Sequence, residues 1–372
     1  MTNHRLSQAL NDSQFSLQVL HDSIEIDRLR NEWIELYRQQ GNRNFAHKWE
    51  WLSSLLKRVF PANAFVCVLR DKGQVVFIHV FKLQARRIAG KPLNILEAIA
   101  NPHYIYFTDS LIKPSHSKPE LLEVMLNKLE SCGVTWDILH YENILEGSSL
   151  HTLLEQHRSL HKNNGFSAYL DTPSIDSLTQ VSKKMRREIR RLKRKIETEF
   201  RDYKFFIGRT EHVQKDIQDF IRLEGSGWKG KGGKSSSLNC QGETAINFFS
   251  HIHKTLAPSS ESITFFLEFS EIRVSSALVL RAGRTLYIHK LGYDENFSTF
   301  GPGAVLCFEI LQWAAEHKDI DRVSFITKPR WHLSSAPLYG FNLYNSELEP
   351  NIIETHKKSL QRLYDLRNIT ES

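Results

Sequence analysis

The chain has 372 residues, of which 41% are hydrophobic and 24% are charged, and its formal net charge is +7. This composition is normal for a globular protein, and the length favours two domains over a single core. No apolar run approaches the roughly 20 residues that a membrane-spanning helix needs. The first residues lack the apolar core of a signal peptide, and the four cysteines stand far apart without a C-x-x-C pair. We therefore expect a cytoplasmic protein with reduced thiols and no transmembrane segment.

Hydrophobic periodicity in the first half predicts a mixed order of helices and strands. A hairpin is expected over 64–83, where two apolar runs flank a turn at Asp71-Lys72-Gly73. Helices are expected at 22–39, 47–60 and 121–129, and a buried strand at 136–141. This order is typical of an α/β domain that contains one antiparallel pair.

The second half repeats this order of elements. Helices are expected at 213–223, 243–255 and 303–317, and strands at 263–269, 273–281, 285–293 and 322–326. The agreement suggests that one fold occurs twice, although the residues themselves show no repeat. Proline and small polar residues at 170–174 interrupt the pattern. We therefore predict domains at 1–170 and 171–372, the first with a structural or acceptor-binding role.

The most strongly charged segment is a predicted helix over 178–200. Its apolar residues recur every three or four positions and form one stripe, and nine lysines and arginines lie between them. One interpretation is the solvated outer face of a helix that packs between domains. The other is a platform for an anionic substrate, such as a nucleotide-linked sugar, a lipid-linked phosphate or RNA, with Arg187 and Arg191 as candidate contacts. No aromatic residue lies among the cations, which disfavours a base-stacking surface.

A glycine-lined loop says most about function. The predicted strand Thr285–Tyr293 leads through Gly301-Pro302-Gly303 into a long amphipathic helix. Backbone N–H groups at such a helix N-terminus face whatever binds there, and the helix dipole adds roughly half a positive charge. This arrangement suits the pyrophosphate of coenzyme A, so we expect acetyl-CoA or another acyl-CoA as co-substrate.

The strand before this loop carries the candidate catalytic residues. Simple alternation places Tyr287, His289, Leu291 and Tyr293 on one face, and Asp294 follows directly. His289 or Asp294 could act as the general base for an attacking amine, and Tyr287 or Tyr293 as the acid for a departing thiolate. A histidine in a strand is also often an ordinary structural residue, and that interpretation stays open.

Other motifs are incomplete. The segment 225–235 ends in Gly-Lys-Ser, but Trp228 stands where a phosphate-binding loop requires its first glycine, so we interpret the segment as a loop facing the substrate. His157 and His161 have a spacing that suits a metal on a helix, yet no third ligand accompanies them. We expect no metal.

Three segments together resemble a known family. SKKMRREIRRLKRKIE, SGWKGKGG and LYIHKLGYDENFSTFGPGAVLCFEILQWAAEH are similar to the GNAT-fold acetyltransferases of the CelD-like group, which are named for cellulose and polysaccharide synthesis. This group is related to the Fem-type peptidoglycan transferases. The resemblance covers most of the chain and implies two tandem GNAT-like domains, each a mixed, mostly antiparallel sheet flanked by helices, with acyl-CoA bound in the second.

The resemblance also implies roles for single residues. Backbone amides of Gly301, Gly303 and Ala304 would hold the pyrophosphate, beside a strand end that opens for the pantetheine arm. Trp228 and Lys229 match the family's segment near the acceptor site. The family commonly has a Tyr-Lys pair before a tryptophan after its last core strand, whereas this chain reads SFITKPRW there.

The expected function is transfer of an acyl group, most simply acetyl, from coenzyme A to an amine of an anionic sugar or cell-envelope precursor. A small or lipid-linked anionic acceptor is the expected partner. One alternative is a Fem-like transferase that takes its aminoacyl group from tRNA. The other is a GNAT scaffold that binds without catalysis, which the altered SFITKPRW segment suggests.

Overall fold

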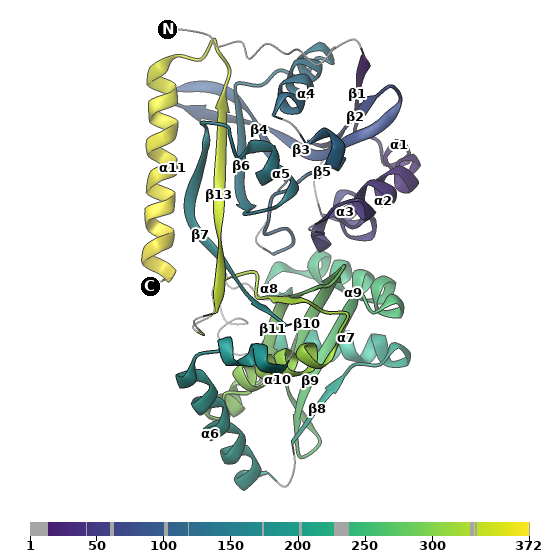
Figure 1. Cartoon of the computed structure of the whole chain (residues 1–372), viewed down its shortest axis with the longest axis vertical. Coiled ribbons are helices and arrows are strands. Elements are labelled where there is room, and N and C mark those ends of the chain that lie inside the picture. Colours follow the sequence, from purple (N-terminus) through teal and green to yellow (C-terminus); the bar gives the residue numbers. More distant parts are fainter. Residues whose placement is uncertain are drawn as a thin grey trace. The chain divides into compact units, whose positions relative to one another are not determined.

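The protein is described from a computed structural model, in which the chain divides into two compact units (Figure 1). The first comprises Met1–Gly165 and Pro337–Ser372, and the second Phe166–Ala336. The structure describes residues 14–41, 43–59, 63–99, 103–117, 119–172, 175–200, 203–226, 238–327, 331 and 333–371.

The first unit is built on a sheet in which only one neighbouring pair of strands is parallel. The strand order is β1-β2-β3-β4-β6-β13, and β4 and β6 form the parallel pair. The short strand β5 pairs with β3 outside this order. The strands are β1 (Phe15–Leu20), β2 (Ala64–Asp71), β3 (Gln74–Ile88), β4 (Lys91–Ala98), β5 (Leu111–Ile112), β6 (Ile138–Leu145) and β13 (Ser334–Tyr344).

Six α-helices accompany this sheet in the described part of the unit. The helix expected over 22–39 is divided in two at Leu29, whose N–H bonds the carbonyl of Ile26 three residues back and so ends the first helix. Asp22 caps that helix by accepting hydrogen bonds from the N–H groups of Ile24 and Glu25. The helices are α1 (Ser23–Arg28), α2 (Arg30–Arg38), α3 (Trp49–Arg58), α4 (Glu120–Ser131), α5 (Ser149–Leu154) and α11 (Pro350–Glu371).

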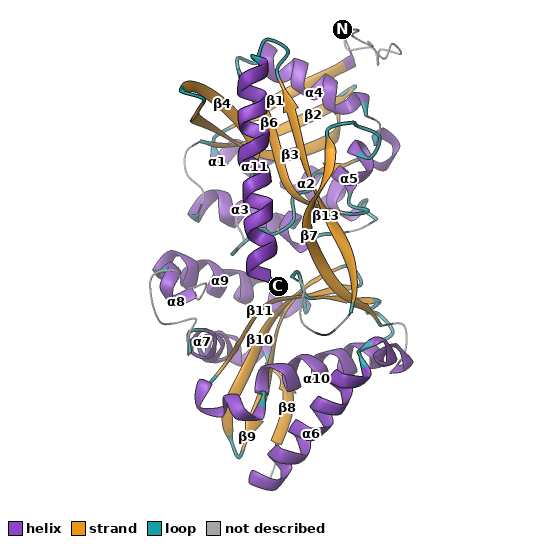
Figure 2. Cartoon of the chain, turned by 90° about the vertical axis from the view of Figure 1, so that its left-hand side faces the viewer, coloured by secondary structure: helices purple, strands orange, loops and turns teal. Residues whose placement is uncertain are grey.

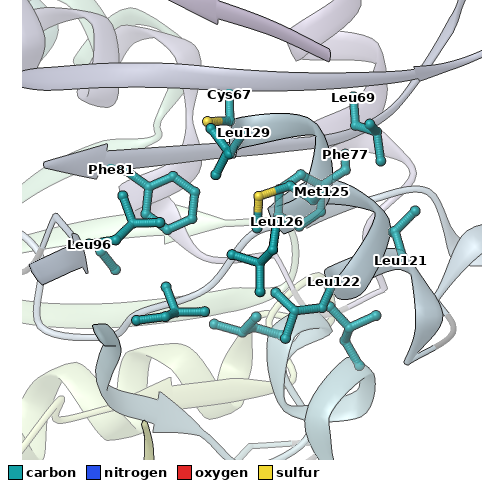
Figure 3. Close-up of a cluster of buried hydrophobic side chains, with 14 of the residues drawn as sticks. Cys67, Leu69, Phe77, Phe81, Leu96, Leu121, Leu122, Met125, Leu126 and Leu129 are labelled. Atoms are coloured by element: carbon teal, nitrogen blue, oxygen red, sulfur yellow. The ribbon is translucent and has the colours of Figure 1, made fainter. Parts of the chain in front are cut away.

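The main core of the first unit lies between the sheet and α4 (Figure 3). Leu121, Leu122, Met125, Leu126 and Leu129 of α4 are spaced so that they form one broad apolar face, which is buried in this core. Burial of this face supplies the hydrophobic stabilisation of the unit. Figure 3 shows Leu121, Leu122, Met125, Leu126 and Leu129 of α4 against Cys67, Leu69, Phe77, Phe81 and Leu96 of the strands.

The second unit has the same strand arrangement. Its order is β8-β9-β10-β11-β12-β7, and β11 and β12 form the parallel pair. Only the end of β7, residues 169–171, pairs with β12. The strands are β7 (Leu160–Asp171), which belongs to this unit from Phe166 onwards, β8 (Tyr203–Ile207), β9 (Ser262–Phe269), β10 (Ile272–Ala282), β11 (Thr285–Tyr293) and β12 (Arg322–Ser324).

Helices cover both faces of this second sheet (Figure 2). On one face α6 (Lys183–Glu199) and α10 (Pro302–Glu316) lie side by side, and their apolar residues share one core with the strands. On the other face lie α7 (Val213–Glu224) and α9 (Glu243–Leu256), with the short α8 (Leu238–Gln241) between them in the chain. The predicted fold class is therefore confirmed: each unit is a mixed, mostly antiparallel sheet flanked by helices.

The two units exchange their sixth strand. In each unit a helix joins the parallel pair, α4 between β4 and β6 and α10 between β11 and β12. In the first sheet the strand next to β6 is β13, which lies near the end of the chain. In the second sheet the strand next to β12 is β7, which comes from the first half of the chain. Residues 337–372, which we expected in the second domain, therefore belong to the first unit.

Hydrophobic burial explains this correction. Phe341 of β13 has no exposed surface and is part of the core with α4, and Ile352 of α11 packs on Leu93, Ile95 and Ile138. Among the described residues no helix has the length and apolar character needed to cross a bilayer. The four cysteines are free thiols.

The first prediction tests this exchange. We expect Phe341→Ala to destabilise the protein by about 3–5 kcal/mol, because the Phe341 side chain is fully buried and its removal leaves a cavity in the core. Hydrogen exchange followed by mass spectrometry should show faster exchange in β3, β4 and β6, with β9 and β10 unchanged. Faster exchange confined to β9 and β10 would contradict the assignment of β13 to the first unit.

The second prediction concerns pH. His356 of α11 is buried against Tyr344, whose hydroxyl lies 3.1 Å from Nδ1, and burial together with nearby His140 and Arg86 lowers its pKa to about 4. A depressed pKa means that the unfolded chain takes up the proton first, so this stability is present above pH 6.5 and is lost as pH falls towards 4.

The comparison is between the native protein and His356→Phe, which cannot titrate. Between pH 7 and pH 4.5 the native protein should lose about 2 kcal/mol more unfolding free energy than the variant. Urea denaturation at the two pH values measures the difference. Equal losses in the two proteins would show that His356 does not couple α11 to pH.

Candidate functional site

The N-terminus of α10 is open to a ligand. Gly301 is its N-cap in a left-handed conformation (φ +56°), no side chain caps the helix, and Pro302 occupies the first position, where a missing N–H costs nothing. The N–H groups of Gly303 and Ala304 come next and have no partner within a helix of this geometry. Two backbone donors and the positive end of a 15-residue helix therefore converge here.

The neighbouring strand β11 leaves its parallel partner early. The ladder between β11 and β12 consists of three residue pairs, from Thr285↔Arg322 to Tyr287↔Ser324, and residues 288–293 lie beyond it. A β-bulge follows at once: Leu278 pairs with Lys290 and Val279 with Ile288, so His289 is inserted between the two pairs. A bulge bends the strand that carries it, which helps to separate β11 from β12.

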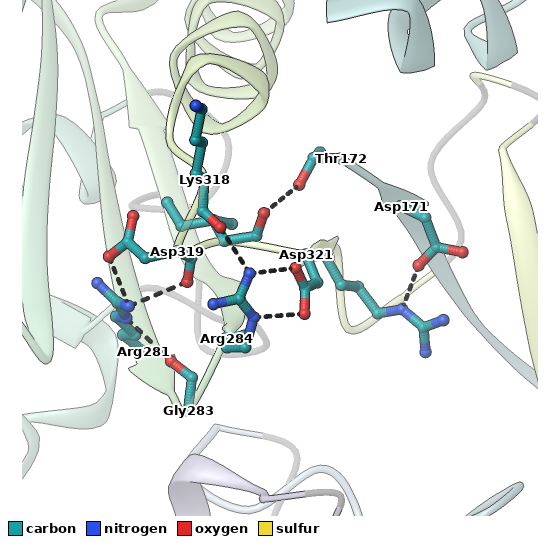
Figure 4. A network of polar contacts seen from close by, with 10 residues as sticks. Asp171, Thr172, Arg281, Gly283, Arg284, Lys318, Asp319 and Asp321 are labelled. Carbon is teal, nitrogen blue, oxygen red and sulfur yellow. Dashed lines mark hydrogen bonds and ion pairs between the residues drawn. The ribbon is translucent and has the colours of Figure 1, made fainter. Parts of the chain in front are cut away.

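A polar network surrounds the starting ends of these two strands and links them to each other and to β10 and β7 (Figure 4). Arg284 bonds both carboxylate oxygens of Asp321 at 2.6 and 2.7 Å and the carbonyl of Lys318 at 2.6 Å. Arg281 pairs with Asp319 at 2.8 Å, and Arg322 with Asp171 at 2.7 Å. Exposed pairs are individually weak, but several together fix the register. The strands are thus held at one end and diverge at the other, beside α10.

Tyr293 lies beside the first turn of α10. A Cβ atom added to Gly303 would stand 3.3 Å from Cδ1 of Tyr293 and 3.3 Å from Cδ2 of Leu291, so glycine allows this close contact. Burial and the hydrogen-bonded Glu295 carboxylate raise the pKa of Tyr293, which keeps the phenol protonated. Tyr293 is therefore a candidate proton donor next to the helix N-terminus.

The bulge corrects the prediction that four side chains share one face. Leu286 and Ile288 lie in the core with α10, so Tyr287 between them points to the opposite face. The ring of His289 lies 5.4 Å from that of Phe249 in α9, which is also on the opposite face. Leu291 and Tyr293, after the bulge, are on the α10 side. Alternation fails because the inserted residue shifts it by one position.

Two further predicted residues have structural tasks. Asp294 accepts a hydrogen bond from the N–H of Asn296 and so caps the 3-10 helix Glu295–Phe300. The N–H of Gly301 donates to the carbonyl of Ser298 at 3.0 Å. Of the three predicted amide donors, Gly303 and Ala304 therefore remain available to a ligand.

The basic helix α6 begins at Lys183, where the Ser182 hydroxyl accepts from the N–H of Met185, and residues 175–180 form a separate 3-10 helix. Arg187 and Arg191 are both exposed. The Arg191 guanidinium bonds Glu188 at 2.6 and 2.9 Å, which lowers the pKa of that carboxyl. The two predicted substrate contacts thus differ, since only Arg191 is neutralised locally.

Part of the predicted site lies outside the described residues: Trp228 and Lys229, and 328–330 of the SFITKPRW segment. Trp331 is described and is buried beside Phe325, at 5.6 Å between ring centroids. His157 and His161 lie after α5 and in β7 rather than on one helix. In the described ranges no three histidine, cysteine or acidic side chains are placed to hold a metal ion.

Sequence reasoning missed residues that shape the loop. Leu192 of α6 packs closely on Gly301: a Cβ atom added to Gly301 would stand 2.7 Å from Cδ1 of Leu192. Lys195 bonds the carbonyl of Thr299 at 3.2 Å and lies over the Phe300 ring. Gly292 allows α7 to touch β11, since an added Cβ would stand 2.2 Å from Cα of Glu224. The glycines in the sequence were the available signal for such close approach.

A protein-family model matches the region that contains this candidate site. Residues 183–330 match the family model described as an acetyltransferase (GNAT) domain, a span that runs from α6 past β12 and contains the whole candidate site. The predicted GNAT relationship is confirmed for this span, whereas the narrower CelD-like group stays a prediction. Comparison with curated proteins found no match.

Solved structures share the fold of the whole chain. A crystal structure of FemX is 10% identical, with a TM-score of 0.55, 94% of this chain covered and 99% of that chain. A conserved protein of unknown function from Bacteroides thetaiotaomicron is 10% identical, with a TM-score of 0.52 and coverage of 85% and 97%. At such identities the likeness concerns the fold. Together with the GNAT domain it supports an acyltransferase.

Proposed function

We propose that the protein is an N-acyltransferase that uses acyl-CoA, most simply acetyl-CoA, and modifies an amine on an anionic acceptor. One observation carries the proposal: the uncapped N-terminus of α10 stands beside the end of β11, where that strand has left its parallel partner. The match to a GNAT domain over residues 183–330 includes both parts.

The donor fits this geometry in two ways. The N–H groups of Gly303 and Ala304 and the helix dipole suit a pyrophosphate. Residues 288–293 of β11 lie beyond the three-pair ladder and offer a strand edge along which an amide-containing pantetheine arm can extend. The same arrangement gives the thioester a fixed position relative to Tyr293.

The reaction is direct transfer. The acceptor nitrogen attacks the thioester carbonyl, the new C–N bond forms and the C–S bond breaks. Tyr293, kept protonated, donates its proton to the departing thiolate, while His289, Asp294 or an ordered water takes the proton of the amine. Of these bases, His289 lies on the opposite face of β11, beside Phe249.

The acceptor is proposed to be an anionic sugar or a precursor of the cell envelope, and the protein to act in the cytoplasm, where acyl-CoA is present. The net charge of +7 and the cations of α6 support an anionic partner. A transferase that takes an aminoacyl group from tRNA is the second candidate, which the exposed cations of α6 also suit. A GNAT scaffold without activity is the third.

Calorimetric titration with acetyl-CoA, palmitoyl-CoA and bulk tRNA separates these candidates. Micromolar binding of either acyl-CoA supports the proposal, and the preferred chain length identifies the donor. Binding of tRNA alone, falling steeply with salt, would favour aminoacyl transfer. Acyl-CoA binding without turnover on a panel of amines would favour the inactive scaffold.

The third prediction tests the pyrophosphate site with Ala304→Asp. An aspartate at this third helical position favours the helix dipole, so we expect unchanged or slightly higher stability, by about 0.3–1 kcal/mol. Its carboxylate should repel the pyrophosphate and weaken acetyl-CoA binding at least tenfold. Ala304→Asn has the same shape without the charge and is the matched control. Equal affinities for the two variants would exclude an anion at this position.

The fourth prediction concerns the proton donor. Tyr293→Phe removes only the hydroxyl, so we expect kcat to fall about a hundredfold while acetyl-CoA affinity stays within twofold. The same substitution at Tyr287, on the opposite face of β11, distinguishes the two tyrosines. A fall in kcat for Tyr287→Phe but not for Tyr293→Phe would overturn the assignment.

A further inference from the structure

The outer face of α6 carries a line of cations whose side chains have no partner among the described residues. Lys183, Arg187, Arg190 and Arg194 follow each other at intervals of four, three and four residues, which places them along one side of the helix. All four are exposed, and none of their side chains forms a hydrogen bond or ion pair with any part of the chain that the structure describes. We call these four residues the α6 ridge.

Other cations of the same helix are already held. Lys193 pairs with Glu309 at 2.6 Å, and Lys195 bonds the Thr299 carbonyl at 3.2 Å. Arg186 donates to the carbonyl of Val181, and Arg191 pairs with Glu188. Helix α6 thus separates its charges into a set that binds the protein and a set directed to solvent. Like charges three and four residues apart repel each other, so the ridge gains nothing from the fold itself.

The rest of α6 determines what kind of contact the ridge can make. Ile189, Leu192 and Ile196 are buried in the core of the second unit, so the helix cannot turn an apolar face outwards or insert into a bilayer. From Lys183 to Arg194 the ridge extends about 17 Å along a straight helix. It can therefore make only a surface contact, with several anions spread along a line.

Of the extended anionic partners, a lipid surface fits these residues better than a nucleic acid. The helix has no aromatic residue on which a base could stack. Exposed cations on one line can meet the headgroups of an anionic bilayer together, and four of them correspond to roughly a thousandfold stronger partition at low salt. Lysine and arginine attract such headgroups without insertion.

We propose that the α6 ridge docks the protein on an anionic lipid surface. The docking itself does not depend on the proposed function. Its consequence for the acceptor does: α6 also contacts the loop before α10, through Leu192 at Gly301 and Lys195 at Thr299, so docking holds that loop within about one helix diameter of the headgroups. An acceptor amine carried by an anionic, membrane-bound molecule would then meet the donor at that surface.

The fifth prediction uses sedimentation with vesicles of phosphatidylcholine alone or with a quarter of phosphatidylglycerol. The native chain should bind only the anionic vesicles, with affinity falling at least tenfold between 50 and 300 mM salt. The variant Lys183→Glu/Arg190→Glu/Arg194→Glu should lose binding at least thirtyfold. Its folding is checked by its thermal unfolding midpoint.

The matched control changes the same net charge elsewhere in the second unit. Lys215, Lys254 and Lys318 are exposed, lie outside α6 and form no ion pair within the described residues, so Lys215→Glu/Lys254→Glu/Lys318→Glu should weaken vesicle binding less than threefold. Equal losses in both variants would overturn the proposal, because net charge rather than the ridge would then bind. Absence of binding to anionic vesicles would also overturn it, as would ridge-dependent binding to bulk tRNA alone.

Acetyl-CoA calorimetry on the ridge variant distinguishes the two proposals. Lost vesicle binding with unchanged acetyl-CoA affinity supports docking as a separate property of the outer face. A native chain that binds anionic vesicles through the ridge but binds no acyl-CoA would leave docking in place and overturn the proposed function.

Discussion

The candidate site depends on one constraint, the short parallel pairing of β11 with β12. Three residue pairs and the ion pair of Arg284 with Asp321 hold these strands together at their starting ends. Beyond them the bulge at His289 bends β11, and residues 288–293 follow a separate course. A longer ladder would close the strand edge that α10 faces. Because α10 connects the same two strands, its N-terminus necessarily starts near the place where they diverge.

Local order was predictable from the sequence, whereas strand pairing was not. Most expected elements, including β9, β10, β11 and α10, lie within two or three residues of their observed bounds. Their apolar periods are local properties. The exchange of β7 and β13 is not a local property, because the residues of an apolar strand do not specify which sheet the strand will join. The edge strands β1 and β8 were missed for a related reason, since their burial is incomplete.

The site shows the same division between local and non-local information. Glycines at 301 and 303 identified the helix N-terminus, since few other residues permit a left-handed turn followed by close packing on Tyr293. The bulge had no sequence signal, and one inserted residue was enough to separate Tyr287 and His289 from Tyr293. Likewise, spacing could not show that Asp294 caps a 3-10 helix or that the Gly301 amide is already bonded to Ser298.

Helix α6 shows both kinds of information, the local kind that the sequence contains and the non-local kind that only the fold supplies. Its apolar stripe was predictable and gives the helix its place beside α10, where Leu192 and Lys195 fix the shape of the loop. Its nine cations look alike in the sequence, yet the fold neutralises some and leaves others in solvent. That division follows from geometry: cations near Glu309 or the loop carbonyls find partners, and those on the outer line do not. One helix thus both shapes the loop before α10 and presents cations whose side chains have no partner in the described part of the chain. In the proposed function, these two features place the acyl donor and an anionic partner on the same helix.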